Sequence, residues 1–251
     1  MRNLVLAVLI LLIGFTPAEA KKKKDKEKKE EKGLSSSTFS GLKWRSIGPA
    51  FVSGRIADFA VDPDDFSTYY VAVASGHIWK TTNNGVTFEP IFDNHGVYSI
   101  GSLAMDPNNS NVVWAGTGEN NHQRALGYGN GVYKTTDGGS SWKNMGLKDS
   151  RHIGEILVDP RNSDVVYVAA EGSAWGPNEE RGVFKTTDGG LTWEKALFIS
   201  ENTGVANLCF EPGNPDVIYA GAEQRRRRQF SKIGGGPESA FYKTTDAGLT
   251  W

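Results

Sequence analysis

The stretch KTTDGGLTW at residues 185–193 decides the fold, because the chain contains it four times in closely related forms. In each copy a Gly-containing pair is followed, after one intervening residue, by Thr or Ser and then by an aromatic residue. Asn-Gly, Gly-Gly and Ala-Gly pairs are typical of the positive-φ turn of a β-hairpin. The other three copies are KTTNNGVTF at 80–88, KTTDGGSSW at 134–142 and KTTDAGLTW at 243–251.

The spacing of these copies predicts the architecture. Their first lysines lie 54, 51 and 58 residues apart, a period that fits one four-stranded blade of a β-propeller. Apolar runs of strand length precede each copy, as expected for sheets covered on both faces. The sequence therefore predicts an all-β protein, within residues 42–251, whose four blades span about 54–92, 97–145, 152–197 and 204–251.

One polar residue in each copy is placed to close its turn. An Asp or Asn side chain at this position can accept hydrogen bonds from the turn amides. We therefore expect a structural rather than a catalytic role for these four residues, which are Asn83, Asp137, Asp188 and Asp246.

The pattern Thr-Thr-Asp-Gly-Gly-x-Ser/Thr-Trp resembles the Asp-box, or bacterial neuraminidase repeat, of sialidases, xyloglucanase-like glycosyl hydrolases and sortilin-type receptors. The resemblance implies a β-propeller whose boxes lie away from the ligand, so it supports the fold more than any activity. Propellers of these families have more than four blades. We therefore expect an N-terminal fragment of a larger ring, in which residues 42–49 form an outer strand.

The first 41 residues differ in composition from the rest. Residues 1–20 combine Arg2, an apolar run and the small-residue site Ala18-Glu19-Ala20, which predicts a secretory signal peptide and a secreted or periplasmic protein. Residues 21–41 begin with a lysine-rich run and are predicted to be a disordered linker. No apolar run is long enough to cross a bilayer, so we expect no membrane span.

Composition narrows the function classes. From Gly33 onward the chain has 19 Lys and Arg against 24 Asp and Glu, a net charge of −5, which makes nucleic acid an unexpected partner. Cys209 is the single cysteine, so no intrachain disulfide is possible. The four histidines show no metal-ligand spacing, and no phosphate loop or dinucleotide motif is present. We expect neither a metal nor a cofactor.

Three long segments follow the second strands of the last three repeats, and ligands usually bind in such loops. Glu119, Glu171 and Glu223 occupy similar places in them. Paired carboxylates can act as general acid and base in glycoside hydrolysis, although acidic residues can equally cap strand ends. Trp175 and the run Arg225–Arg228 are candidates for binding an acidic glycan or an anionic peptide, with simple solvation as the alternative.

The first strand of each blade should line the propeller axis, and one position in it is polar in all four repeats. Such a ring indicates either a water-filled channel or a ligand site. Arg55 and His152 share another equivalent position at the expected channel mouth, where they could clamp a carboxylate or a sugar; an internal ion pair explains Arg55 equally well. The ring residues are Asp58, Ser102, Glu155 and Asn207.

The resemblance also implies catalytic patterns, and the sequence departs from them. Xyloglucanase-like propellers carry a catalytic Asp in a Thr-Asp-Ile-Gly-Gly stretch, where this chain has VASGHI at 73–78. The Arg-Ile-Pro motif of sialidases is absent around Arg45 and Arg55. The sequence therefore favours a module that binds a peptide or a carbohydrate, with glycoside hydrolysis on a polysaccharide as the alternative.

Overall fold

The computed structural model describes residues 36–42, 54–121 and 126–251. The predicted signal peptide, the lysine-rich run and nearly all of the predicted outer strand at 42–49 lie outside these residues. The chain divides into one unit of residues 1–50 and another of 51–251. In the first unit, Ser36–Phe39 form a short 3-10 helix, η1.

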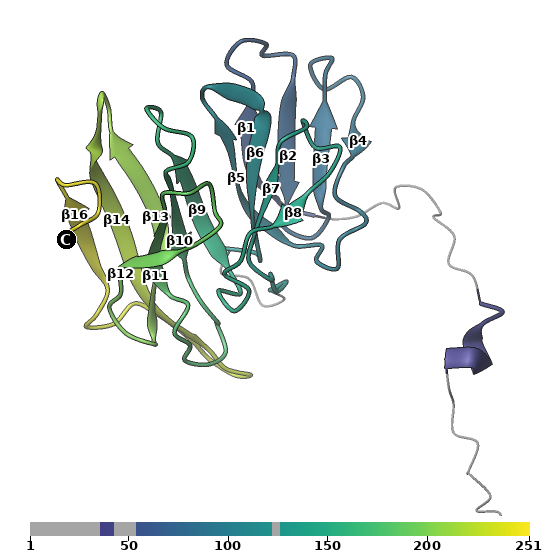
Figure 1. The fold of residues 1–251 in the computed structure, drawn as a ribbon. Helices are drawn as coiled ribbons and strands as arrows, with labels where there is room; N and C mark the ends of the chain where they lie inside the picture. Colours follow the sequence, from purple (N-terminus) through teal and green to yellow (C-terminus); the bar gives the residue numbers. More distant parts are fainter. Residues whose placement is uncertain (1–35, 43–53, 122–125) are drawn as a thin grey trace, which may run out of the picture. The chain divides into compact units, whose positions relative to one another are not determined.

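The second unit contains four antiparallel sheets of four strands each, which confirms the predicted all-β fold with four propeller blades (Figure 1). Blade 1 consists of β1 (Ile56–Val61), β2 (Tyr69–Val73), β3 (Ile78–Thr81) and β4 (Glu89–Pro90). Blade 2 consists of β5 (Ile100–Asp106), β6 (Asn109–Thr117), β7 (Val132–Thr135) and β8 (Lys143–Asn144). Blade 3 consists of β9 (Ile153–Val158), β10 (Val166–Ala170), β11 (Gly182–Thr186) and β12 (Glu194–Leu197).

Blade 4 differs from the other three in its strand pairing. It consists of β13 (Thr203–Glu211), β14 (Asn214–Arg227), β15 (Lys232–Gly234) and β16 (Ala240–Thr244). Both β15 and β16 pair with β14. The segment after Glu223 was predicted to be an irregular loop. That prediction was wrong, because β14 continues through the first three arginines and forms a hairpin with β15.

The innermost strands of successive blades contact one another, β1 with β5, β5 with β9 and β9 with β13. Each innermost pairing contains a register shift at the same place, where one small residue is bulged. A Cβ atom on Gly154 would lie 2.1 Å from the carbonyl oxygen of Ala206 in the next blade. Larger side chains would therefore push the innermost strands apart. The bulged residues are Ala57, Gly101, Gly154 and Ala206.

The hydrophobic core lies between blades rather than within any one of them. One cluster joins buried Tyr70 and Phe92 of blade 1 to Tyr133 and Trp142 of blade 2, and equivalent clusters join blades 2 and 3 and blades 3 and 4. The Phe92 and Trp142 rings meet edge to face at 5.5 Å. Burial of these faces is the main source of stability, so each blade depends on its neighbour.

Candidate functional site

The strands alternate in direction, so the repeated KTT turns share one end of the blades with the turns between first and second strands. We call this the turn end. The opposite end, called the loop end, carries residues 118–121 and 126–131, residues 171–181 and the β14–β15 hairpin. The two ends expose different chemistry, and the predicted site residues divide between them.

At the turn end, the four repeated turns have the same geometry. Both residues of the Gly-containing pair have positive φ in every copy, for example 67° at Gly138 and 93° at Gly139, which confirms the predicted hairpin turn. The Asp137 carboxylate accepts hydrogen bonds from the Thr135 hydroxyl (2.7 Å), the Ser141 amide (2.8 Å) and the Ser141 hydroxyl (2.6 Å). These bonds, from Ser141 above all, lower the pKa of Asp137 to about 2. The equivalent acceptors are Asn83, Asp188 and Asp246.

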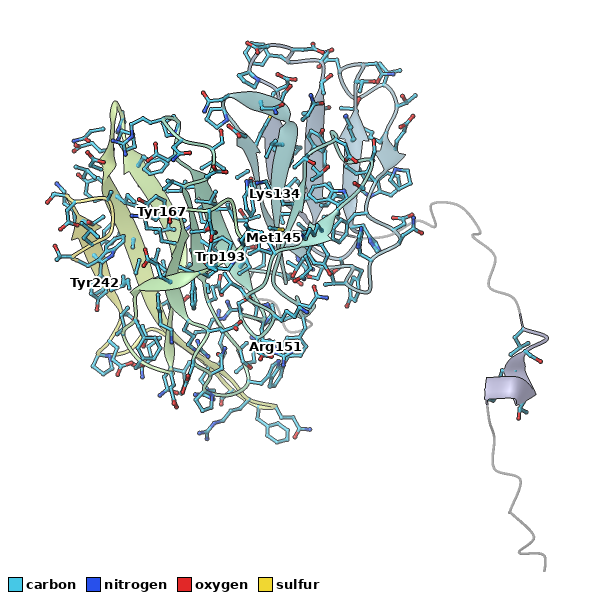
Figure 2. All side chains as sticks on the ribbon, in the orientation of Figure 1. Lys134, Met145, Arg151, Tyr167, Trp193 and Tyr242 are labelled. Atoms are coloured by element: carbon cyan, nitrogen blue, oxygen red, sulfur yellow. The ribbon has the colours of Figure 1, made fainter. Side chains whose placement is uncertain are left out.

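The lysines of the first three turns each connect one blade to the next. Lys134 Nζ lies 4.6 Å from the ring centroid of Trp114 and donates to the carbonyl oxygen of Gly189 in blade 3. Lys80 and Lys185 make the same two contacts with their own blade and the following one. Trp193 of blade 3 adds a further contact at this end, because its Nε1 donates to the Met145 carbonyl of blade 2 at 2.7 Å (both residues are labelled in Figure 2). The turn end is therefore closed by contacts that repeat from blade to blade.

At the loop end, two ion pairs join different blades. Arg55, directly before β1, binds the Glu119 carboxylate, which is fully buried after β6. Arg225 on β14 binds the Glu171 carboxylate after β10, and both of these side chains are buried. Burial lowers the pKa of Arg225 to about 10. The structure thus shows an internal ion pair for Arg55, with Glu119 as the partner.

These pairs change the interpretation of the three loop glutamates. Glu119 and Glu171 face arginines in the protein interior instead of an open groove. The half-buried Glu223 lies on β14, opposite Gly204 of β13, and not in a loop. The three carboxylates therefore do not meet as a pair that could receive a sugar.

A buried histidine and a buried arginine complete the region beneath the loops. His152 is fully buried, and its ring lies 5.4 Å from that of Tyr128. Burial and the charge of Arg225 lower the pKa of His152 to about 3. Arg181 donates to the carbonyl oxygens of Glu171 at 2.6 Å and Gly176 at 3.0 Å, so it shapes the loop that carries Trp175. No sequence pattern singles out Arg181, because its acceptors are backbone atoms.

Next to this buried region, the loop end has an open pocket of about 510 Å³ lined by Trp175, Asn202, Arg226 and Arg228, among others. A second hollow, which Trp175 also lines, includes Arg228, Phe230 and Lys232. Trp175 is 43% exposed. An exposed indole can stack on a planar or ring-shaped group, and the guanidinium groups beside it can bind carboxylates.

The arginine run divides within this pocket. Arg225 is buried against Glu171, and Arg226 donates to the Asn202 side chain. Arg228 is exposed, and its backbone amide donates to the Ser231 carbonyl at 2.8 Å. Among the described residues, its guanidinium has no hydrogen-bond or ion-pair partner. Arg228 is therefore the guanidinium of this pocket that is available to a ligand.

The predicted polar ring lies on the innermost strands at one common register, beside the bulges. Asp58 accepts a hydrogen bond from the Leu103 amide of blade 2 at 2.8 Å. Burial and the charge of Asp58 raise the pKa of Glu155 to about 7. Ser102 is buried and Asn207 is exposed. Asp58 and Glu155 thus interact electrostatically. Among the described residues, no hydrogen bond or ion pair joins Asn207 to either of them.

Neither a membrane helix nor a metal cluster emerges from the part of the chain that the structure describes. Within it, no helix has the length and apolar character needed to span a membrane. No group of three or more His, Cys, Asp or Glu side chains within the same residues is arranged to hold a metal ion.

Comparisons with known proteins agree with this architecture. The Sortilin-Vps10 family model, described as sortilin, neurotensin receptor 3, matches residues 130–251. The chain is 22% identical over 243 residues to xyloglucanase Xgh74A of Acetivibrio thermocellus, covering 83% of this chain and 26% of that protein. It is 26% identical over 241 residues to a xyloglucanase of Hypocrea jecorina, covering 84% and 27%.

Solved structures show the same fold. The GH74 xyloglucanase of Xanthomonas campestris matches with a TM-score of 0.55 at 20% identity, covering 79% of this chain and 30% of that one. An ancestral GH74 enzyme matches with a TM-score of 0.52 at 24% identity, covering 68% and 22%. The chain spans about a quarter of the length of the curated relatives that it matches. In its repeats and its blades, the chain resembles the sortilin-type and the xyloglucanase-type propellers.

Proposed function

We propose that this chain is an exported propeller module that binds a peptide or a glycan at its loop end. The observation that carries the proposal is the pocket in which exposed Trp175 lies beside Arg226 and Arg228. Aromatic and arginine side chains are the residues that most often provide binding energy at protein surfaces. The similarity to sortilin-type propellers supports the same class of function.

The positive charge of this pocket restricts the class of ligand that it can bind. Arg226, Arg227, Arg228 and Lys232 gather around the two hollows, while the chain from Gly33 onward has a net negative charge. A local positive pocket on an acidic protein attracts anionic groups selectively. The ligand should therefore carry carboxylates or other acidic groups.

Titration calorimetry on the full chain can test this proposal with an acidic oligosaccharide, an acidic peptide and a neutral xyloglucan oligosaccharide as probes. We expect one acidic probe to bind, and Trp175→Ala and Arg228→Ala each to weaken it about tenfold or more. Phe66→Ala is the matched control, because Phe66 is 74% exposed at the turn end. Binding that none of the loop-end substitutions alters, or no binding of any probe, would contradict the proposal.

Glycoside hydrolysis is the second candidate, and one observation favours it. With a pKa of about 7, Glu155 is about half protonated in neutral solution and could donate a proton beside the Asp58 carboxylate. The similarity to xyloglucanases supports this class, whereas the absence of an Asp at residues 73–78 counts against it.

Turnover assays on xyloglucan, β-glucan and sialosides separate the two candidates. If Glu155 is a general acid, turnover should decline as the pH rises above about 7, and Glu155→Gln should abolish it with the circular dichroism spectrum unchanged. That result would replace the binding proposal. Binding of a probe without turnover of any substrate would instead support the binding module.

A further inference from the structure

The loop that carries Trp175, residues 171–181, contains its own buried arginine. Arg181 is 1% exposed and lines neither of the two hollows that Trp175 lines. Its guanidinium connects backbone positions before and after Trp175 in the sequence. The acceptors are the carbonyl oxygens of Glu171 at 2.6 Å, of Gly176 at 3.0 Å and of Ser173.

The partners of Arg181 differ from those of the other buried arginine in this region. Arg225 is paired with the Glu171 carboxylate. Among the described residues, Arg181 forms no ion pair, and its hydrogen-bond acceptors are the three loop carbonyls. Burial, followed by the charge of Arg226, lowers the pKa of Arg181 to about 10. It stays protonated at neutral pH, so the buried guanidinium is compensated by the loop backbone.

Asn178 connects the same loop to segments outside it. Its Oδ1 accepts a hydrogen bond from the Ser173 amide at 2.7 Å, and its Nδ2 donates to the Asp149 carbonyl at 2.8 Å. The Asn178 amide donates to the Glu201 carbonyl at 3.1 Å. The loop is therefore held by a second set of bonds, independent of Arg181.

A backbone hydrogen bond joins the Trp175 loop to the β14–β15 hairpin. The Arg227 amide donates to the carbonyl of Ala174, a residue that is 2% exposed, at 2.6 Å. Trp175 directly follows Ala174, and Arg226 directly precedes Arg227. The loop backbone thus fixes the indole relative to the strand that carries the arginines of the pocket.

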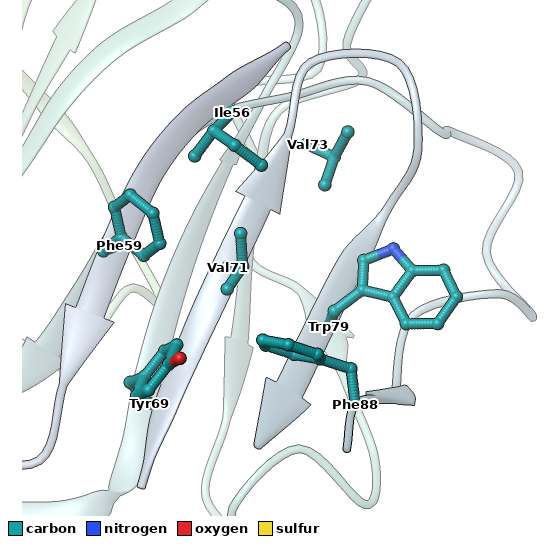
Figure 3. A pocket seen from close by; sticks show the side chains of 7 residues that line it. All are labelled: Ile56, Phe59, Tyr69, Val71, Val73, Trp79 and Phe88. Carbon is teal, nitrogen blue, oxygen red and sulfur yellow. The ribbon is translucent and has the colours of Figure 1, made fainter. Parts of the chain in front are cut away.

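A second indole shows a different means of fixation. Trp79 lines the apolar pocket of blade 1 (Figure 3), and its own Nε1 donates to the Gly76 carbonyl at 2.8 Å. Among the described residues, the Trp175 indole makes no such hydrogen bond. Its position therefore depends on the backbone of its loop, and hence on the carbonyls that Arg181 binds.

We propose that Arg181 is the positioning residue of the loop-end site, holding Trp175 in its ligand-binding position without contacting the ligand. The inference rests on the binding function proposed above. An aromatic side chain that is ordered in advance binds a ligand without the cost of immobilising its loop. Loss of Arg181 should therefore weaken binding by making the free loop mobile, although every residue that lines the pocket is unchanged.

Hydrogen–deuterium exchange and fluorine NMR on the ligand-free full chain test this positioning directly. Arg181→Met should speed up amide exchange in residues 171–178 about tenfold or more and leave β7 of blade 2 unchanged. In protein labelled with 5-fluorotryptophan, Trp175→Phe identifies the Trp175 signal by removing it. That signal should shift or broaden in Arg181→Met, whereas the Trp79 signal should not.

Three further variants make the result specific. Arg181→Lys keeps the charge but not the planar fork of donors, so it should recover only part of the protection. Asn178→Ala should loosen the same loop, and both variants carry the test if circular dichroism shows that Arg181→Met is unfolded. Arg161→Met is the matched control, because it makes the same substitution at the turn end of the same blade. It should leave the loop and the Trp175 signal as in the wild type.

Titration calorimetry with hexaglutamate and trigalacturonate measures the consequence for binding. The affinity for the probe that the wild type binds should fall about tenfold in Arg181→Met and less in Arg181→Lys. Unchanged exchange and an unchanged Trp175 signal in the Arg181 variants overturn the inference. Equal loss of protection in every blade also overturns it, because the role of Arg181 would then be structural only. A wild type that binds neither probe contradicts the proposed function instead, since the exchange and fluorine measurements need no ligand.

Discussion

At the turn end, Asp137 binds Thr135 and Ser141 inside its own nine-residue turn, whereas at the loop end Glu171 binds Arg225, 54 positions along the chain. Asp137 is exposed to solvent, whereas Glu171 is buried. The first kind of contact recurs in every blade, while the second differs from blade to blade. The local polar contacts are thus common to all four blades, whereas the buried long-range ion pairs distinguish one blade from another.

The largest expected effect comes from breaking the buried ion pair at the loop end. Arg225→Ala leaves the Glu171 carboxylate buried without its partner, so the free energy of unfolding should fall by about 3–5 kcal/mol. The double variant Arg225→Met with Glu171→Leu removes both charges and should recover most of that loss. Urea unfolding measures both variants. A double variant as unstable as the single one would show that packing, not the unpaired charge, is responsible.

A pH titration distinguishes the contribution of the loop end to stability from that of the turn end. Because the pKa of His152 is lowered to about 3, its contribution to stability is present above about 6.5 and is lost as the pH falls toward 3. His152→Phe should remove this dependence, so that at pH 4 the variant is more stable than the wild type by on the order of 3 kcal/mol. Thermal unfolding at pH 7 and pH 4 measures it, and parallel pH profiles would contradict the assignment.

A smaller effect is expected at the turn end. Asp137→Ala removes the acceptor for the Ser141 amide and hydroxyl, so the melting temperature should fall by a few degrees. Asp137→Asn reproduces the first turn, where Asn83 accepts from the Thr87 amide at 3.0 Å, and should lose less. Since the pKa of Asp137 is about 2, its contribution is present above about 3.8 and lost as the pH falls through 2. The Asn variant should not show that acid step.

The smallest effect tests the contact between turns of successive blades. Lys134→Met removes a hydrogen bond to the Gly189 carbonyl and a contact with the Trp114 ring, which should cost about 1 kcal/mol. Within the described residues, the Lys243 ammonium contacts only the Tyr219 ring, so Lys243→Met should cost less. Equal losses in urea unfolding would show that the inter-blade hydrogen bond contributes nothing.

The ring residues show how much of a candidate site a sequence pattern can predict. The repeat alignment placed Asp58, Ser102, Glu155 and Asn207 at one register, and the structure confirms that common position on the innermost strands. Their environments could not be predicted, because burial depends on the neighbouring blade: Ser102 is buried and Asn207 is exposed. The perturbed pKa of Glu155 depends on Asp58, which lies in a different blade.

The sequence by itself determined the repeat, the four blades and the positive-φ turns, because these depend on residues a few positions apart and on an apolar pattern that every blade shares. The tertiary structure alone decided the partners of Arg55 and Arg225, the burial of Glu119 and Glu171, and the pocket beside Trp175. Four consecutive arginines look alike in the sequence, yet Arg225 is buried and Arg228 is exposed. The physical reason is that burying a charged side chain costs free energy unless a partner compensates it. For Arg225 that partner is Glu171 of another blade, and packing between residues far apart in the chain brings the two together.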